Sequence, residues 1–435
     1  MASTTIKMST LPENETPRRW AELSLFLIGG AFVFVSLLAL IIERGRFNWQ
    51  DWLPLIVWIG ASVVGSRLIN RQLPDRERLL FPLIMLMSGW GLVIIKRLAP
   101  NFADRQSVWL VVSVAALVAI VYMPNVLRLL RAYRYILLVI GLVLLVATIL
   151  LGRNPSGTPG APALWLGFGD FFFQPSELLK VILVVFLASY LAEQYPALRS
   201  EGIAMEQRRF SPRIVGPIAL MWGLSVVILI WQRDLGTAIL FFIVFLVLLY
   251  VASGYTPLLL IGALLIAAAG FFAYQLFDVV QLRIDIWLNP WLEADGRAYQ
   301  IVQSLLAFAA GSIFGQGIGQ GSPTYIPVVH SDFIFAALAE EWGLLGVVLV
   351  IACLAAFVIQ GMRIAIVQRA RPFHALLAVG LSVLVATQSL LIMGGVLKLI
   401  PLTGVTLPYF SYGGSSLLVN FVIVGLLLRL SSGEN

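Results

Sequence analysis

Residues 333–360 read FIFAALAEEWGLLGVVLVIACLAAFVIQ, and within this stretch only Glu340 and Glu341 carry a formal charge. A helix that crosses the hydrocarbon core of a bilayer needs about 20 predominantly apolar residues. Lipid offers no hydrogen-bond partners to the backbone, so a segment of this composition must pair its own amide groups as a helix. The stretch therefore predicts a membrane-spanning helix.

The same composition recurs along the whole chain. Of its 435 residues, 60% are hydrophobic and 12% are charged, whereas a soluble domain has roughly 45–50% and about 25%. Apolar stretches predict about twelve spans, at residues 20–42, 52–69, 79–95, 107–123, 134–152, 176–194, 214–231, 235–252, 257–276, 333–360, 373–396 and 412–430. The span at 235–252 is the least distinct, because only a short polar turn separates it from the one before. We expect an all-α polytopic membrane protein, which excludes a soluble enzyme, a disordered chain, a disulfide scaffold and an outer-membrane barrel.

The distribution of basic residues predicts the orientation, since Lys and Arg accumulate in short cytoplasmic loops. With the N-terminus inside, 18 of the 29 basic residues fall on the inner side. We therefore expect cytoplasmic tails at 1–19 and 431–435, and extracellular loops at 153–175 and 277–332. The basic residues would contact anionic lipid headgroups, which removes nucleic acid as a partner. Any chemistry is expected on the outer face.

Patterns for metals, disulfides and nucleotides are weak. The single cysteine, Cys353, lies in an apolar stretch, and His330 and His374 have no ligand neighbours at zinc-site spacing. The glycine-rich run at 311–321 lacks the Lys-Ser/Thr of a Walker phosphate loop. The run indicates only that the chain bends closely there.

Charged side chains lie at or near the first residues of two predicted spans. Glu177 and Lys180 are three residues apart, so they share one helix face. They form either a structural ion pair that fixes the helix or part of a polar substrate cavity. Between the spans at 214–231 and 235–252 lies Gln232-Arg233-Asp234, where Asp234 is suited to cap the following helix.

A second group of acids surrounds the start of the span at 333–360. Ser331 or Asp332 could cap this helix. Asp332 could instead be a general base, because burial at the membrane boundary beside His330 would raise its pKa. Glu340 and Glu341 follow deeper in the same apolar segment, where charges are costly.

The last polar segment, residues 401–418, reads PLTGVTLPYFSYGGSSLL. Its Pro, Gly and hydroxyl residues at the mouth of a span predict an irregular segment that lines a cavity. An ordinary loop followed by a capping serine is the alternative.

Together these segments resemble the SEDS family, the shape, elongation, division and sporulation proteins that include RodA-like and FtsW-like members. The resemblance rests on QPSELLK at 174–180, DLGTA at 234–238, Tyr299-Gln300, HSDFIF at 330–335, Glu340-Glu341 and the SYGGSS that ends at Ser416. It implies a ten-helix core with two extra N-terminal helices and a large extracellular loop before helix 10. N-terminal helices would then occupy 20–152 and the catalytic membrane core 153–430. Two positions depart from the family pattern: Arg233 replaces a Pro, and Val328-Val329 replaces a Glu.

The resemblance implies a peptidoglycan glycosyltransferase of the bacterial cytoplasmic membrane, which polymerises lipid II on the outer face during cell elongation or division. Asp332 would be the catalytic residue, and a class B penicillin-binding protein would be the partner. No residue is assigned as a metal ligand, although a divalent cation such as Mg²⁺ or Mn²⁺ could assist. The candidate substrate-binding residues are Arg283, Lys180, Arg233, Glu177, Ser176, Ser415 and Ser416.

Two other functions remain open at this point. The chain could be a transporter of lipid II, with Glu340, Glu341 and Lys180 along its path, although no inverted repeat is apparent. It could also be a non-catalytic scaffold for a penicillin-binding protein.

Overall fold

The computed structural model describes residues 15–45, 47–154, 163–168, 171–198 and 234–433, together with residues 216, 223, 226, 227, 230 and 231. Within this part of the chain, 11 helices are long and apolar enough to cross a membrane. The prediction of an all-helical polytopic membrane protein is confirmed.

The long helices each overlap one predicted span. They are α1 (Glu15–Arg44), α2 (Leu53–Gln72), α3 (Leu80–Leu98), α4 (Pro100–Tyr122), α6 (Arg134–Leu151), α7 (Pro175–Leu198), α10 (Leu235–Ser253), α11 (Pro257–Leu276), α14 (Ile334–Val367), α15 (Pro372–Val396) and α16 (Gly414–Ser431). The span at 235–252 is a separate helix, α10. The predicted span at 214–231 lies almost entirely outside the described residues.

Short elements connect the long helices. They are η1 (Trp49–Trp52), α5 (Val126–Ala132), β1 (Leu166–Phe168), β2 (Phe171–Phe173), α12 (Asp278–Leu288), η2 (Pro290–Glu293), α13 (Tyr299–Gly311) and η3 (Pro323–Tyr325). The strands β1 and β2 pair antiparallel, with Leu166 opposite Phe173. Helix α12, η2, α13 and η3 all belong to the long connection between α11 and α14.

Proline and acidic side chains mark where several helices begin. Pro100, Pro257 and Pro372 occupy the first turns of α4, α11 and α15, where the missing N–H has no intrahelical partner to lose. Asp234 caps α10, because its side chain accepts a hydrogen bond from the Thr237 backbone N–H. The capping role predicted for Asp234 is therefore confirmed.

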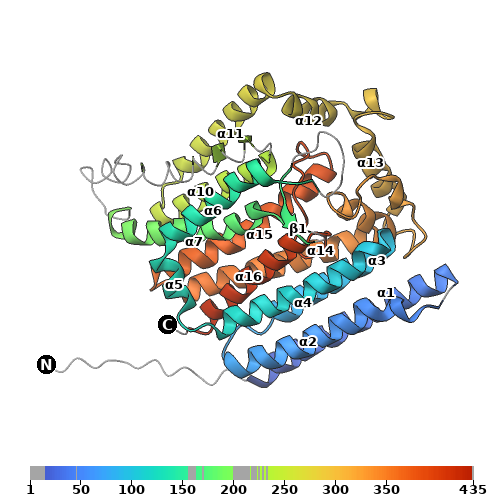
Figure 1. The fold of residues 1–435 in the computed structure, drawn as a ribbon, viewed down its shortest axis with the longest axis horizontal. Coiled ribbons are helices and arrows are strands. Elements are labelled where there is room, and N and C mark those ends of the chain that lie inside the picture. Colours follow the sequence, from blue (N-terminus) through green and yellow to red (C-terminus); the bar gives the residue numbers. More distant parts are fainter. Residues whose placement is uncertain are drawn as a thin grey trace.

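Figure 1 shows the long helices side by side, with α1 and α2 at one edge of the bundle. Helix α1 packs along α3, and α2 packs along α4. Buried residues make up 94% of the apolar 18-residue stretch of α3 but only 6% of that of α11, at the opposite edge. The N-terminal pair thus covers α3, and α11 leaves most of its surface to the surroundings.

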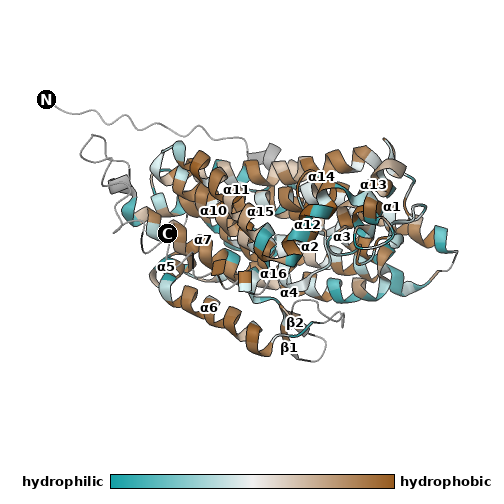
Figure 2. Cartoon of the chain, turned by 90° about the horizontal axis from the view of Figure 1, so that it is seen from above, coloured by the Kyte–Doolittle hydropathy of each residue, from teal (hydrophilic) through white to brown (hydrophobic). Residues whose placement is uncertain are grey.

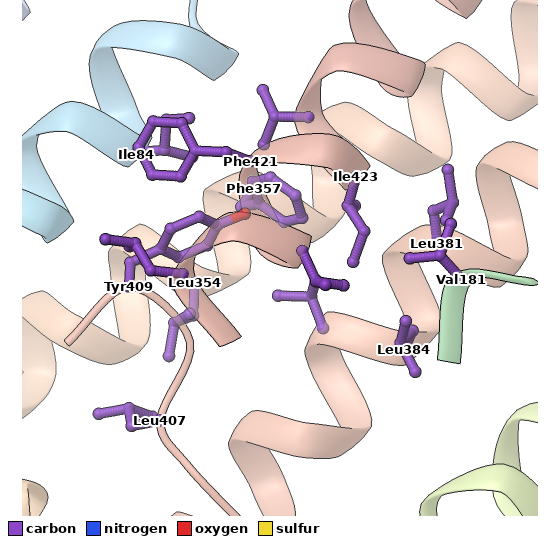
Figure 3. Close-up of a cluster of buried hydrophobic side chains, with 14 of the residues drawn as sticks. Ile84, Val181, Leu354, Phe357, Leu381, Leu384, Leu407, Tyr409, Phe421 and Ile423 are labelled. Carbon is purple, nitrogen blue, oxygen red and sulfur yellow. The ribbon is translucent and has the colours of Figure 1, made fainter. Parts of the chain in front are cut away.

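The buried centre of the molecule lies among α3, α7, α14, α15 and α16. Figure 3 shows Phe357 of α14 and Phe421 of α16 next to Tyr409 of the connection between α15 and α16, with Leu381 of α15 on the other side of the same cluster. All four side chains are at most 3% exposed. Close packing rather than hydrophobicity holds helices together in lipid, so this centre fixes how the helices around it are placed.

Hydrophobic residues dominate the long helices in Figure 2, whereas the shorter α12 also carries Asp278, Gln281, Arg283 and Asp285. Helix α14 is interrupted at Gly343, whose φ of 65° and ψ of −165° are not helical. The connection 312–322 fills this break, and the Gly317 backbone N–H donates to the Glu341 carbonyl at 3.1 Å. A Cβ on Gly343 would lie 2.3 Å from the Gly315 nitrogen, so only glycine fits. The close bend predicted from the glycine run is present here.

Candidate functional site

Asp332 lies two residues before α14 and is half-buried. The Ser331 hydroxyl donates a hydrogen bond to Asp332 Oδ1 at 2.7 Å. Desolvation raises the pKa of Asp332 to about 6, against the opposing effects of Ser331 and of the Arg283 charge. Neither Ser331 nor Asp332 caps the helix, because Phe333 occupies the N-cap and no side chain bonds there. A carboxyl group that ionises near neutral pH is suited to general base catalysis.

Arg283 of α12 faces Asp332 across Gly404. A Cβ on Gly404 would lie 3.7 Å from Arg283 Nη2 and 3.9 Å from Asp332 Oδ2. Arg283 Nη1 also donates to the Thr403 carbonyl at 3.4 Å. Burial lowers the pKa of Arg283, and the charges of Asp234 and Asp332 raise it. The guanidinium therefore acts electrostatically on both carboxyl groups.

Asp234 is a second carboxyl group beside this cation. Its Oδ1 accepts from the Thr237 backbone N–H at 3.2 Å. Its Oδ2 is buried and has no hydrogen-bond partner within the described part of the chain. Burial raises the pKa of Asp234, and the Thr237 hydrogen bonds and the charge of Lys180 oppose this rise. A buried oxygen of this kind can accept a hydrogen bond from a ligand.

Glu177 and Lys180 form the predicted pair, with 2.6 Å between Glu177 Oε2 and Lys180 Nζ. Lys180 Nζ also donates to Gln388 Oε1 at 3.0 Å. Gln388 Nε2 donates in turn to the Thr406 carbonyl at 2.8 Å, and the hydroxyls of Thr406 and Ser416 lie 2.9 Å apart. The result is one polar network that joins α7, α15, the irregular connection and α16.

Two of the predicted serines have structural contacts. The Ser415 hydroxyl accepts from the Gln174 backbone N–H at 2.9 Å. The Ser176 hydroxyl accepts from Gln174 Nε2 at 3.1 Å. Both therefore hold the start of α7 in place, next to the Glu177–Lys180 pair. Arg233 lies outside the described residues.

The segment predicted to be irregular, 401–418, has no helix before Gly414 and is largely buried. It contacts the residues next to Asp332 directly. The Ser411 hydroxyl donates to the Ser331 carbonyl at 2.7 Å, and the Tyr412 backbone N–H donates to the His330 carbonyl at 2.9 Å. These contacts fix the approach of the chain to Asp332.

Glu340 and Glu341 belong to a different set of contacts. Glu340 Oε1 accepts from the Ser322 backbone N–H at 2.7 Å. Arg97 Nε lies 3.0 Å from Glu341 Oε1. The two acids thus hold the connection 312–322 against α14, and neither of these contacts involves Lys180.

Sequence reasoning missed Gln388, Thr406, Gly404 and Arg97. Gln388 carried a usable signal, because an amide inside an apolar span is costly unless it is bonded. For Gly404 and Thr406 the sequence predicted only that they belong to an irregular segment. Nothing in the sequence near Arg97 points to Glu341.

Among the described residues, no group of three or more His, Cys, Asp or Glu side chains is placed to hold a metal ion. Participation of Mg²⁺ or Mn²⁺ therefore stays a hypothesis without an assigned ligand set.

The fold and the site define a polytopic helical membrane protein with acidic and cationic side chains clustered around an irregular buried segment. The chain belongs to the FtsW/RodA/SpoVE family of cell cycle proteins, whose sequence model matches residues 76–435. This is the SEDS family that the motifs predicted. The match begins after α2, so α1 and α2 lie outside the family model, in the region where the two extra N-terminal helices were predicted.

Curated relatives and solved structures agree with this assignment. The chain is 37% identical to "Peptidoglycan glycosyltransferase RodA" of Mycobacterium tuberculosis, over 96% of this chain and 91% of that protein. It is 32% identical to "Probable peptidoglycan glycosyltransferase FtsW" of Geobacter metallireducens, over 81% of this chain and 91% of that protein. The crystal structure of Rod shape determining protein RodA from Thermus thermophilus is similar, with a TM-score of 0.58, 25% identity and coverage of 82% of this chain and 97% of that one. A chain solved in a peptidoglycan synthase complex has a TM-score of 0.68, 25% identity and coverage of 83% and 99%.

Proposed function

We propose that the chain is a peptidoglycan glycosyltransferase that polymerises lipid II, with Asp332 as its general base. The role of Asp332 is supported by one observation. Its carboxyl group, with a pKa of about 6, shares the small space around Gly404 with the Arg283 guanidinium. A base needs a pKa near the working pH, and positioned proton transfer contributes typically 10²–10⁴-fold.

The reaction follows from these groups. The Asp332 carboxylate takes the proton from the attacking sugar hydroxyl of one lipid II molecule. That oxygen forms a bond to the anomeric carbon of the growing strand, and the bond from this carbon to the pyrophosphate breaks. The electron pair leaves with the polyprenyl pyrophosphate, whose developing negative charge Arg283 stabilises.

Lys180 and the polar network around it support binding of the substrate. Lys180 is buried, with 3% exposure, and its charge reaches Asp234. Asp234 offers an unpartnered acceptor oxygen. We infer that Lys180, Glu177 and Ser416 shape the polar wall of the substrate site, while Ser176 and Ser415 hold α7 in the position this requires. Arg233 is retained as a further candidate for the pyrophosphate.

The orientation supports polymerisation on the outer face of the bacterial cytoplasmic membrane. Both termini are cytoplasmic in this proposal, and the long connection between α11 and α14 is extracellular. The relative solved in a peptidoglycan synthase complex supports a class B penicillin-binding protein as the partner. In this organisation, residues 20–152 provide the N-terminal helices and 153–430 the catalytic membrane core.

The test uses purified full-length protein in liposomes and fluorescent lipid II. Asp332→Asn keeps the shape of the side chain but removes the base, so polymer formation should fall by about 10² or more. Asp278→Asn is the matched control, because Asp278 is an exposed acid at the start of α12 and should leave the rate unchanged. A parental rate in Asp332→Asn would refute the assignment. Translocation of labelled lipid II without polymer in the parent protein would favour the transporter instead.

A further inference from the structure

A cavity of about 430 Å³ lies where α1, α2 and the connection from α2 to α3 meet. It is lined by Glu22, Leu23, Phe26, Ser66, Asn70, Pro74 and Arg78. This volume falls within the range of roughly 300–1,000 Å³ that is typical of small-molecule sites. All but one of the lining residues precede the family match, which begins at residue 76, so the extra N-terminal helices build this cavity.

The cavity lies at the end of the bundle opposite Asp332. Glu22 is in the first turns of α1, whereas Glu43 near the end of α1 lies 3.2 Å from a Cβ built on Gly319. Gly319 belongs to the connection that leads to Asp332. At 1.5 Å per residue, the helix from Glu22 to Glu43 is about 30 Å long, which is one membrane thickness. The cavity and the polymerisation site are therefore separate sites.

The polar wall of the cavity carries an arginine, Arg78, that is only loosely paired. Arg76, which is fully buried, has its Nη2 2.6 Å from Glu22 Oε1. Arg78 approaches the same carboxylate only at 3.9 Å and otherwise donates to the Pro74 carbonyl at 3.3 Å. The short contact with Glu22 thus belongs to Arg76, on which the charge of Glu77 also acts. The Arg78 guanidinium has only the long contact with Glu22, so an anion in the cavity would give it a closer partner.

The opposite wall is apolar, and aromatic side chains place the cavity at headgroup level. Leu23 and Phe26 of α1 form this wall. Trp20, which is 70% exposed, lies at the same end of α1, and Tyr122 at the end of α4 donates its hydroxyl to the Leu68 carbonyl of α2 at 3.3 Å. Exposed Trp and Tyr gather at the boundary between hydrocarbon and headgroups. A ligand with an anionic head and an alkyl chain matches these two walls.

We propose that this cavity binds an anionic phospholipid of the leaflet opposite the polymerisation site. The Arg78 guanidinium donates to the lipid phosphate, and the start of an acyl chain contacts Leu23 and Phe26. The lipid phosphate supplies the close anionic partner that Arg78 does not have in Glu22, which lies 3.9 Å away. It holds the ends of α1 and α2 together at the membrane surface.

The experiment measures lipid retention by native mass spectrometry of the full-length protein, released from nanodiscs that contain equal amounts of phosphatidylglycerol and phosphatidylcholine. The parent should retain phosphatidylglycerol preferentially. Arg78→Gln should lose about tenfold in retention, because a charge-assisted hydrogen bond to phosphate is among the stronger contacts. Arg78→Lys should recover part of it. Arg71→Gln is the matched control, since Arg71 is an exposed arginine in the last turn of α2 that does not line the cavity.

Two further arms make the outcome decisive. Glycerophosphoglycerol, which has the headgroup without chains, and inorganic phosphate should displace phosphatidylglycerol only weakly if the apolar wall contributes. Equal displacement would mean an anion site and would overturn the lipid assignment. Equal retention of both lipids, an unchanged Arg78→Gln, or an equal loss in Arg71→Gln would overturn the proposal as well. Polymerisation by Arg78→Gln at the parental rate would show that the variant is folded.

Discussion

Arg97 at the end of α3 and Glu341 in α14 are joined across 244 positions of sequence, with 3.0 Å between Arg97 Nε and Glu341 Oε1. The same guanidinium donates through Nη2 to the carbonyls of Gly319 and Gly321, at 2.9 and 3.0 Å. Arg97 therefore connects α3, the glycine-rich connection and the helix that starts next to Asp332. This contact therefore links the position of α3, against which α1 packs, to the position of the chain around Asp332.

Breaking this contact should lower stability. Arg97→Ala leaves Glu341 buried at 3% exposure without its cation, and removal of one partner of a buried pair costs about 3–5 kcal/mol. We expect a clear fall in the thermal midpoint of the purified protein. Adding Glu341→Gln to Arg97→Ala should restore part of the loss. Arg128→Ala, at an exposed arginine of α5, should leave the midpoint within error, and an Arg97→Ala midpoint equal to that of this control would contradict the prediction.

The polymerisation rate should depend on the ionisation of Asp332. Its pKa is raised to about 6, and the base acts only as the carboxylate. Below that pH the rate should fall by roughly tenfold per pH unit, and above it the rate should level off. Single-turnover rates between pH 5 and 8 measure this profile. Because the folded protein holds the proton more tightly than an ordinary aspartate, ionisation of Asp332 also removes stability as the pH rises toward 6.

Arg283→Gln should move this profile to higher pH. The Arg283 charge opposes the rise in the pKa of Asp332, so its removal raises that pKa further. The plateau rate should fall too, because the leaving pyrophosphate loses a cation. Arg297→Gln is the control: Arg297 is paired with Glu293 in an exposed part of the same connection. A midpoint that does not move in Arg283→Gln would count against the electrostatic coupling.

Gly404→Ala should reduce the rate more than it reduces stability. Gly404 has a φ of 74° and lies between Arg283 Nη2 and Asp332 Oδ2. An alanine in this conformation costs about 1–2 kcal/mol, and its methyl group would occupy the space shared by the two side chains. Gly254→Ala is a matched control, with a φ of 69° and no atom within 4 Å of the added Cβ. Both variants should lose similar stability in thermal unfolding, but only Gly404→Ala should lose polymerisation.

The Glu177–Lys180 pair should prove both structural and functional. Lys180→Met leaves a carboxylate at 6% exposure unpaired, so stability should fall by about 3–5 kcal/mol. Combining Lys180→Met with Glu177→Gln removes both charges and should recover most of the stability. The polymerisation rate should stay low in the double variant, because Gln388 and Asp234 still lack the ammonium group. Full recovery of the rate would assign the pair to structure alone.

Prediction from the sequence worked best for features that depend on neighbouring residues. The apolar runs predicted each described span. The span at 235–252, the least distinct in sequence, is the separate helix α10 capped by Asp234. The motif order predicted the family. The capping reading of Ser331 and Asp332 was wrong, because the chain enters α14 through Phe333 with no side-chain cap. Arg233 and the span at 214–231 lie outside the described residues and stay predictions.

The sequence by itself determined the membrane class, the order of the helices and the segment that carries Asp332, because these follow from local hydrophobicity and short motifs. The tertiary structure alone decided which helices are central. The apolar 18-residue stretch of α3 has a mean hydropathy of 1.5 and 94% of its residues are buried, whereas that of α11 has 2.2 and only 6% are buried. In a bilayer a side chain can be apolar because it faces lipid or because it faces another helix, so hydrophobicity does not distinguish the two. Contacts such as that of Lys180 with Gln388, 208 positions apart, form only when the helices pack with those two faces toward each other.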